Sequence, residues 1–278
     1  MADDGVFRSG IMLRIGKTED IERQYEEGYL KFSCPGNWIM YAKKNHDDGI
    51  ADMYEAIFAH VKRDDPRLLK ACNNDPANMA LSLWCEAGSD DTIYARYVYS
   101  CLVPTVCFYS IDVKDVVRYF GLPMERGNWV EVDLMPYYES LGIKNREEYS
   151  ILAIHSVREL VEELRREIPK LIGGMVIIEK RHFNPESALA VDYVKYDLDL
   201  NEEFIDPYPY KALFRKRPEF REQREARMVI PGVIFLRYPY ENPDKWEDHV
   251  MKVPVPGIKD YAEVIPAGKY TKYRYIFP

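Results

Sequence analysis

The strongest candidate for chemistry in the chain is a glutamine and a glutamate two residues apart, Gln223 and Glu225. Apolar residues 228–230 follow, and Pro231-Gly232 closes the stretch, a pattern that predicts the end of a buried strand. Because side chains alternate between the two faces of a strand, extending this strand backwards puts Gln223 and Glu225 on one face. An amide and a carboxylate at the mouth of a strand can bind a sugar hydroxyl and stabilise a developing cation.

Two other polar residues lie on the first elements that the sequence predicts. Arg14 is carried by a short apolar strand over residues 11–15, and Ser33 ends a second strand over residues 29–33. Acidic residues suited to a helix N-terminus, and a glycine suited to a C-terminal cap, predict one helix between them over residues 18–27. The chain therefore opens as strand, helix and strand, and the strands of Arg14 and Ser33 can be neighbours.

The rest of the pattern favours an α+β fold with a mixed, mostly antiparallel sheet flanked by helices. Strands and helices alternate early, but later strands follow one another through short turns, which argues against a doubly wound parallel sheet. Further helices are predicted over residues 37–45, 50–61, 112–121 and 156–168. Further strands are predicted over residues 103–111, 129–134, 175–179, 188–198, 233–238 and 272–277. No linker divides the chain, so we expect one domain over residues 1–278.

The composition excludes several classes of protein. With 278 residues, 47% of them apolar, the chain can bury a sizeable core, and its net charge of −8 argues against a protein that coats nucleic acid or an anionic membrane. The five cysteines form no CxxC pair and the five histidines are scattered, so neither a metal site nor a disulfide framework is predicted. The sequence also lacks a signal peptide, an apolar run long enough to span a membrane, and the Rossmann, Walker A, GxSxG and HExxH motifs. We expect a cytoplasmic protein without a membrane partner.

The order of the polar residues resembles the arginine–serine–glutamate class of ADP-ribosyltransferases. The resemblance lies in LRIG around Arg14, in LKFS ending at Ser33, and in QRE from Gln223 to Glu225. That family has an arginine on its first core strand, a Ser/Thr-rich strand, and a Q-x-E or E-x-E motif. Here the second strand reads FSC in place of the usual Ser-Thr-Ser. Residues 45–205 match nothing in the family and would form an insertion of helices and strands.

The resemblance implies NAD as co-substrate, with no metal. Arg14, with Gly16 beside it, would hold the NAD phosphates, because a guanidinium binds two phosphate oxygens at once. Ser33 would orient the nicotinamide-side ribose or the glutamate. Glu225 would bind the ribose 2′-OH and stabilise oxocarbenium-like charge as nicotinamide leaves, and Gln223 would contact the acceptor.

Aromatic residues near Ser33 could complete such a site. Trp38 and Tyr41 lie on adjoining turns of a predicted helix, where they would stack on the cationic nicotinamide ring or pack in the core. The other residues also have plainer interpretations. Arg14 can be an ordinary strand-edge arginine, and Ser33 alone can be structural.

The acceptor is predicted from a basic segment, residues 211–227. It holds seven basic and three acidic residues, whereas the whole chain has a net charge of −8. A basic segment in an otherwise acidic protein suggests an anionic partner. The side chains expected to bind single-stranded bases are Phe214, Arg215, Arg217, Phe220 and Arg221. RNA or DNA is therefore preferred over protein as the acceptor. Alternatively, these charges serve NAD phosphates, or form a solvated ion-pair ladder with Glu222 and Glu225.

The leading interpretation is an ADP-ribosyltransferase that transfers ADP-ribose from NAD to a macromolecule. Microbial members of the family are often toxins or anti-phage effectors, so the resemblance implies such a role and an antitoxin partner. An NAD glycohydrolase would use the same site with water as the acceptor. A nucleic-acid or protein interaction domain would use the arginine-rich strand as a docking edge.

Overall fold

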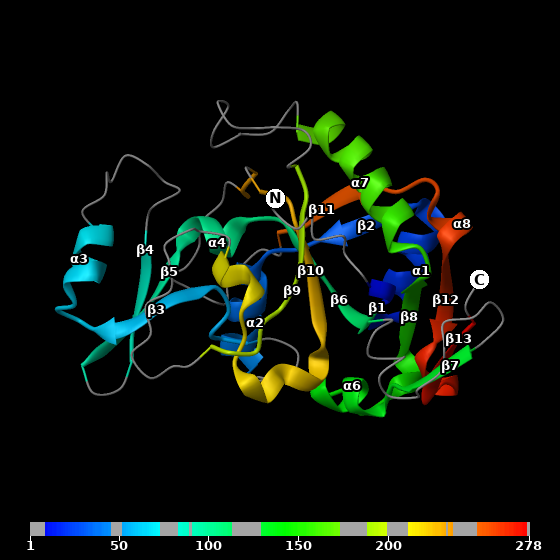
Figure 1. Ribbon diagram of the computed structural model, residues 1–278, viewed down its shortest axis with the longest axis horizontal. Helices are drawn as coiled ribbons and strands as arrows, with labels where there is room; N and C mark the ends of the chain where they lie inside the picture. Colours follow the sequence, from blue (N-terminus) through cyan, green and yellow to red (C-terminus); the bar gives the residue numbers. More distant parts are fainter. Residues whose placement is uncertain are drawn as a thin grey trace.

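The structure of the protein is a computed structural model that describes residues 9–45, 52–72, 83–88, 91–112, 129–172, 188–198, 211–231, 233–235 and 249–276. Its centre is a six-stranded sheet with the strand order β12-β8-β1-β6-β10-β9, in which every neighbouring pair is antiparallel. The strands are β1 (Ser9–Lys17), β6 (Thr105–Asp112), β8 (Tyr149–Ile154), β9 (Ala190–Tyr193), β10 (Glu225–Val229) and β12 (Ala262–Pro266). The sheet occupies the centre and right of Figure 1. The expected α+β class with a mostly antiparallel sheet is confirmed.

The side chains of β1 alternate between two apolar cores. Met12 belongs to a core that contains the apolar stripe of the long helix α7 (Val157–Ile172) and Ile21 of α1 (Thr18–Glu27). Leu13, the next residue, belongs to a core with the tyrosines of α6 (Met135–Ser140). The period of two along the strand therefore decides which core each residue enters.

β1 and β6 pair over only part of their length. Their register ends where Leu13 lies opposite Tyr109, and from Arg14 onward β8 alone pairs with β1 among the described strands. β6 extends from Tyr109 back to Thr105 along β10. The two central strands therefore separate, and a gap opens in the middle of the sheet.

The chain crosses this gap between Arg14 and Ser33. Helix α1 ends at Gly28, whose φ of 66° is a left-handed conformation that suits glycine, and β2 (Tyr29–Phe32) follows. β2 pairs with β11 (Met251–Pro254), and Ser33 exchanges two backbone hydrogen bonds of 2.9 and 2.7 Å with Thr105 of β6. Arg14 and Ser33 thus do not lie on paired strands; each borders β6 at a different end of the gap.

A three-stranded sheet with the order β3-β5-β4 lies to the left in Figure 1. Its strands are β3 (Ile57–Lys62), β4 (Leu83–Ala87) and β5 (Thr92–Tyr97). Three helices accompany it: α2 (Pro35–Asn45), α3 (Pro66–Cys72) and α4 (Val98–Leu102), the last leading directly into β6. The other described elements are β7 (Trp129–Asp133) paired with β13 (Lys272–Ile276), α8 (Ile258–Tyr261), and the 3-10 helices η2 (Arg146–Glu148), η4 (Lys211–Phe214), η5 (Pro218–Gln223) and η7 (Ala267–Lys269).

Several sequence predictions need correction. Where a helix was expected over residues 50–61, the described part contains the strand β3, because its five consecutive buried residues suit a strand that is covered on both faces. The strand expected over residues 188–198 is only four residues long, and η5 replaces the backward extension of the strand before Glu225. The segment 45–205, predicted as an insertion relative to the resembled family, supplies β6, β8 and β9 to the main sheet. The elements expected over residues 113–121, 175–179 and 236–238 lie outside the described residues.

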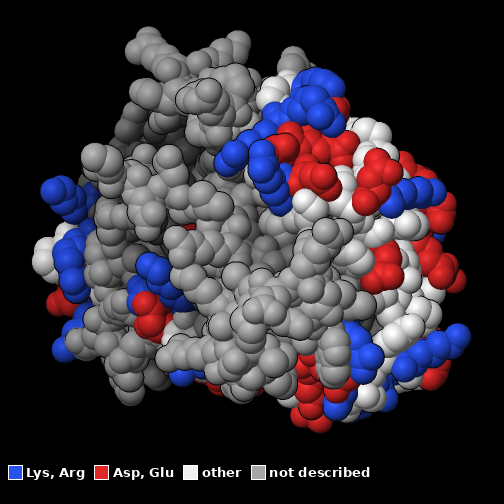
Figure 2. Space-filling model, turned by 45° about the vertical axis from the view of Figure 1, so that its right-hand side comes forward, with Lys and Arg blue, Asp and Glu red and all other residues white. Residues whose placement is uncertain are grey.

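Charged side chains are frequent on the surface of the described residues. On the side that faces the viewer in Figure 2, acidic and basic groups are interspersed over the described residues. The outer face of α7 forms ion pairs such as Arg158–Glu162 at 2.8 Å and Lys170–Glu167 at 2.7 Å. Within the described part of the chain, no helix has both the length and the apolar character that a membrane span needs.

Candidate functional site

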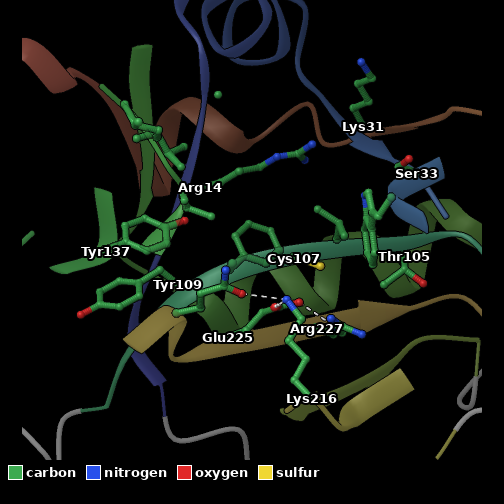
Figure 3. Close-up of a pocket in the computed structure, with 18 of the residues that line it drawn as sticks. Arg14, Lys31, Ser33, Thr105, Cys107, Tyr109, Tyr137, Lys216, Glu225 and Arg227 are labelled. Carbon is green, nitrogen blue, oxygen red and sulfur yellow. Dashed lines mark hydrogen bonds and ion pairs between the residues drawn. The ribbon is translucent and has the colours of Figure 1, made fainter. Parts of the chain in front are cut away.

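A cavity of about 290 Å³ lies in the gap where β1 and β6 separate. Its lining contains both predicted strand residues, Arg14 and Ser33, and both members of the predicted pair, Gln223 and Glu225. Gly16 and Trp38 also line it, whereas Tyr41 of the same helix is 44% exposed and lies outside the lining. In Figure 3 the Arg14 side chain extends across one side of the cavity, and Glu225 lies on the other side with Lys216 and Arg227.

The backbone before β10 turns sharply between the two members of the Gln223–Glu225 pair. Gln223 is the last residue of η5, Arg224 has a φ of 40°, and Glu225 is the first residue of β10. The two side chains are therefore not alternate residues of one strand, as the sequence predicted. They nevertheless line the same cavity, and both are buried.

Glu225 belongs to a cluster of four buried charges, formed with Glu55, Lys216 and Arg227, which we call the four-charge cluster. Arg227 donates from Nε to Glu225 Oε1 at 2.5 Å and grips both oxygens of Glu55, at 2.7 and 2.8 Å. Lys216 Nζ lies 2.6 Å from Glu225 Oε2 and 3.3 Å from Glu55 Oε1. Two cations and two carboxylates thus balance one another, so the solvated ion-pair ladder expected for Glu225 is wrong.

The four-charge cluster fixes the ionisation of Glu225. Burial alone would raise the pKa of this carboxyl, but attraction to Arg227 and Lys216 outweighs burial and holds the pKa well below its usual range. Burial would likewise lower the pKa of Lys216, but Glu225 and Glu55 together raise it. Glu225 is therefore a carboxylate throughout the neutral range. Besides Arg227 and Lys216, the thiol of Cys107 also hydrogen-bonds to the Glu225 carboxylate.

Arg14 is held differently from the cations of the four-charge cluster. Its Nη1 is buried and makes no hydrogen bond within the described structure, and burial lowers the pKa of the guanidinium. Lys31, a second cation of the lining, lies 3.8 Å from Asp20. Glu55 and Glu225 are already matched by Lys216 and Arg227, and Asp20, outside the lining, offsets only part of the charge of Lys31 and Arg14. The lining therefore keeps an excess of positive charge that suits an anionic ligand.

Ser33 and Trp38 form the side of the cavity next to β2. Ser33 Oγ accepts a hydrogen bond of 2.6 Å from Asn37 Nδ2, which leaves the serine hydroxyl proton to donate elsewhere. Asn37 is itself held by the backbone of His249, to whose carbonyl it donates at 2.8 Å. The ring of Trp38 lies 5.3 Å from the Arg227 guanidinium, so one cation already contacts this aromatic ring.

The residues predicted to bind an acceptor are mostly occupied inside the protein. Phe214 and Phe220 are each only 8% exposed, so neither ring offers a face on which bases could stack. Arg215 pairs with Asp197 at 2.8 Å, and Arg217 pairs with Asp52 at 3.0 Å. Arg215, Lys216, Arg217 and Arg227 of the basic segment thus form ion pairs within the protein, and of the predicted five only Arg221 is exposed.

Sequence reasoning missed much of the lining. Glu55, Lys216 and Arg227 were not predicted, nor were Lys31 and the β6 residue Cys107, whose pKa burial and Glu225 raise. Tyr109, Tyr137 and Tyr149 add an aromatic side, with the first two rings stacked 4.3 Å apart. Of these residues, only Arg227 could have been predicted from the sequence. It lies two residues after Glu225 in a strand predicted to be buried, and a buried charge requires a partner of opposite charge.

Comparison with protein-family models, with curated protein sequences and with solved structures gives no match for this chain. Among the described residues, no three His, Cys, Asp or Glu side chains lie close enough together to bind a metal ion. The function must therefore be argued from the cavity itself.

Proposed function

We propose that the protein splits NAD in this cavity and transfers the ADP-ribose to an acceptor. One observation carries the proposal. Arg14, Ser33, Gln223 and Glu225, selected by their resemblance to one enzyme class and widely separated in the sequence, line one cavity. An arrangement of this kind is unexpected if the four residues are ordinary structural residues, because nothing in their sequence positions alone brings them together.

The charges of the cavity support the same proposal. Arg14 has a buried donor that no described residue satisfies and would supply it to a phosphate, a group that a guanidinium binds through two oxygens. The volume of about 290 Å³ lies just below the range for ligand sites, about 300–1,000 Å³. We therefore infer that the cavity holds one end of the dinucleotide, the nicotinamide with its ribose, and that the rest lies nearer its mouth.

In the proposed reaction, the bond between the nicotinamide nitrogen and the ribose carbon breaks. The nitrogen keeps the electron pair and leaves as neutral nicotinamide, and positive charge develops on the ribose. Glu225 stays ionised at neutral pH and would stabilise that charge, which exists fully only in the transition state. An acceptor group then bonds to the ribose carbon and loses a proton.

The acceptor is either a macromolecule or water. The preference for RNA or DNA rested on the basic segment, whose phenylalanines are buried and whose arginines 215 and 217 are paired. A macromolecular acceptor and water, as in a glycohydrolase, are therefore separate outcomes of one experiment. We also propose a cytoplasmic location, since Cys101 and Cys107 form no disulfide bond.

The test is incubation of the protein with NAD labelled in the adenosine part, with cell lysate as the source of acceptors. Released nicotinamide is measured, and RNA, DNA and protein are separated and counted for label. We expect release by the wild type and at least a hundredfold slower release by Glu225→Gln. Glu222→Gln, at an exposed glutamate three residues earlier, is the matched control and should keep the wild-type rate.

The outcomes separate the candidate functions. Label in a macromolecule supports a transferase, and release without label supports a glycohydrolase. A wild type that releases no nicotinamide and whose melting temperature does not change with NAD contradicts both. An interaction domain would then be the better interpretation.

A further inference from the structure

Lys216 makes three polar contacts that join the four-charge cluster to Gln223. Its Nζ lies 2.6 Å from Glu225 Oε2, 2.7 Å from Gln223 Oε1 and 3.3 Å from Glu55 Oε1. An ammonium group has three N–H donors, so these three acceptors use all of them. With 5% of its surface exposed, Lys216 contacts both members of the Gln223–Glu225 pair and has no donor left for a ligand.

The contact with Lys216 also orients the Gln223 amide. Because an ammonium can only donate, the atom that faces it must be the amide oxygen, Oε1. The amide nitrogen then points the other way and donates to the Ser140 carbonyl at 3.2 Å. Lys216 thereby decides which end of the amide faces Glu225 and which faces α6.

Glu55 keeps the cluster neutral and is itself firmly held. Without Glu55, two buried cations would face the single carboxylate of Glu225. Arg96 of β5, 1% exposed, fixes the turn that carries Glu55 by donating to the Glu55 carbonyl at 2.9 Å and to the Met53 carbonyl at 2.5 Å. The three-stranded sheet thus supports the charge balance at the cavity.

We propose that Lys216 is the positioning residue of the site: it holds the Glu225 carboxylate and the Gln223 amide in one arrangement, and Glu55 balances its charge. This inference rests on the proposed function, because it assigns a role to Lys216 in the same reaction. Lys216 does not touch the substrate; it acts through the two side chains that it holds. The segment around it is fixed by backbone hydrogen bonds, from Lys216 N to Lys195 O at 2.9 Å and from Leu198 N to Lys216 O at 3.1 Å.

A positioning role makes a prediction about pH that a purely structural role does not. The charged and titratable side chains that face Glu225 come from the strand itself and from every element packed against it: Arg227, Lys216, Glu55, Cys107, Tyr137 and Tyr196. Arg227 and Lys216 are its two cationic contacts. Loss of the Lys216 charge removes one of them, so Glu225 should take up a proton at a higher pH than in the wild type.

The experiment compares the wild type with Lys216→Met, Lys216→Arg and the charge-balanced double variant Lys216→Met/Glu55→Gln. The double variant is expected to fold even if Lys216→Met alone does not, because its two remaining buried charges, Arg227 and Glu225, still balance one another. Lys259→Met is the control, since Lys259 pairs with Glu26 on the surface at 2.5 Å. Two quantities are measured, from the lowest pH at which the protein stays folded up to about pH 9: the rate of nicotinamide release, and the ¹³C shift of the Glu225 carboxyl, which is assigned by its loss in Glu225→Gln.

We expect Lys216→Met and the double variant to release nicotinamide about tenfold to a hundredfold more slowly, as misplacement of a catalytic group by about 1 Å does. In both variants, the pH below which the release rate falls and the midpoint of the Glu225 titration should move together to higher pH. Lys216→Arg keeps the positive charge, so its release rate and its titration midpoint should lie close to those of the wild type. An unchanged titration midpoint in Lys216→Met and the double variant overturns the inference. If the wild type releases no nicotinamide, the proposed function fails, while the carboxyl titration still decides whether Lys216 controls Glu225.

Discussion

Replacement of Arg227 by methionine tests what the four-charge cluster contributes to folding. Arg227 is fully buried, grips both oxygens of Glu55, donates to Glu225, and donates from Nη1 to the Leu213 carbonyl at 2.5 Å. Methionine is flexible and of similar length, so it fills most of the space with little void. The main change is therefore electrostatic, because Lys216 alone must then balance Glu55 and Glu225.

The expected loss is large relative to the stability of the protein. Removal of one partner from a buried ion pair lowers the free energy of unfolding by about 3–5 kcal/mol, and domains are stable by only about 5–15 kcal/mol. We expect Arg227→Met to lose about 4 kcal/mol at pH 7. The loss should be smaller near pH 5, because one of the two carboxyl groups then takes up a proton and no longer needs a cation.

The assay is urea unfolding at pH 7 and pH 5, with a double-mutant cycle between Arg227→Met and Glu55→Gln. The double variant regains charge balance through Lys216 and Glu225, so it should be about 2 kcal/mol more stable than the sum of the single losses predicts. Arg158→Met, at an exposed ion pair on α7, should change the urea midpoint little. A loss below about 1 kcal/mol in Arg227→Met, or strict additivity with Glu55→Gln, would refute the reasoning.

Two further predictions concern the pH dependence of the four-charge cluster, and two concern Arg14 and Gly28. The pKa of Glu225 lies below its unfolded value of about 4.3, so its stabilisation should be complete above about pH 5 and fall as the pH drops further. The pKa of Lys216 is raised above its unfolded value of about 10.4, so its contribution to stability should be complete below about pH 10 and fall above it. Urea midpoints measured from about pH 3 to 11 check the acid side for Glu225 and the alkaline side for Lys216. Arg14→Met should keep or raise the melting temperature, because it removes a buried donor that has no hydrogen bond among the described residues. It should also abolish the rise in melting temperature that the proposed function predicts on addition of NAD. Gly28→Ala should lose about 1 kcal/mol of unfolding free energy at a φ of 66°, without affecting nicotinamide release.

The sequence predicted correctly those helices and strands whose hydrophobic period or capping residues match the burial they have in the folded protein. The strand of Arg14, the helix that follows it and the amphipathic α7 were all predicted, because each has a clear hydrophobic period or cap. β3 was mistaken for part of a helix, because residues 50–61 also carry apolar residues at helical spacing. Pairing with β5 decides that segment, and pairing partners far along the chain leave no mark in a local pattern.

The candidate site was predictable only where residue type alone carried information. Arg14, Ser33 and Glu225 were found through an ordered motif, and the gap between β1 and β6 brings them to one cavity. Lys216 and Glu55 carry no motif, since their roles depend on contacts with Glu225 that only the folded chain creates. The phenylalanines of the basic segment were misassigned because sequence does not distinguish an aromatic residue that is buried from one that is exposed.

Replacement of all four charges at once decides whether the cluster is kept for stability or for the site. Buried ion pairs replaced together by apolar or neutral groups of similar volume often leave stability unchanged or raise it by about 1–4 kcal/mol. We therefore expect the variant Glu55→Gln/Lys216→Met/Glu225→Gln/Arg227→Met to be about as stable as the wild type in urea, although Arg227→Met alone loses stability. It should release no nicotinamide. A quadruple variant as unstable as Arg227→Met would mean that the cluster is needed to hold β10, the loop of Lys216 and the turn of Glu55 together. Stability near the wild-type value would mean that folding does not need these charges, and their retention along a cavity wall would then be explained by the ligand that the cavity binds.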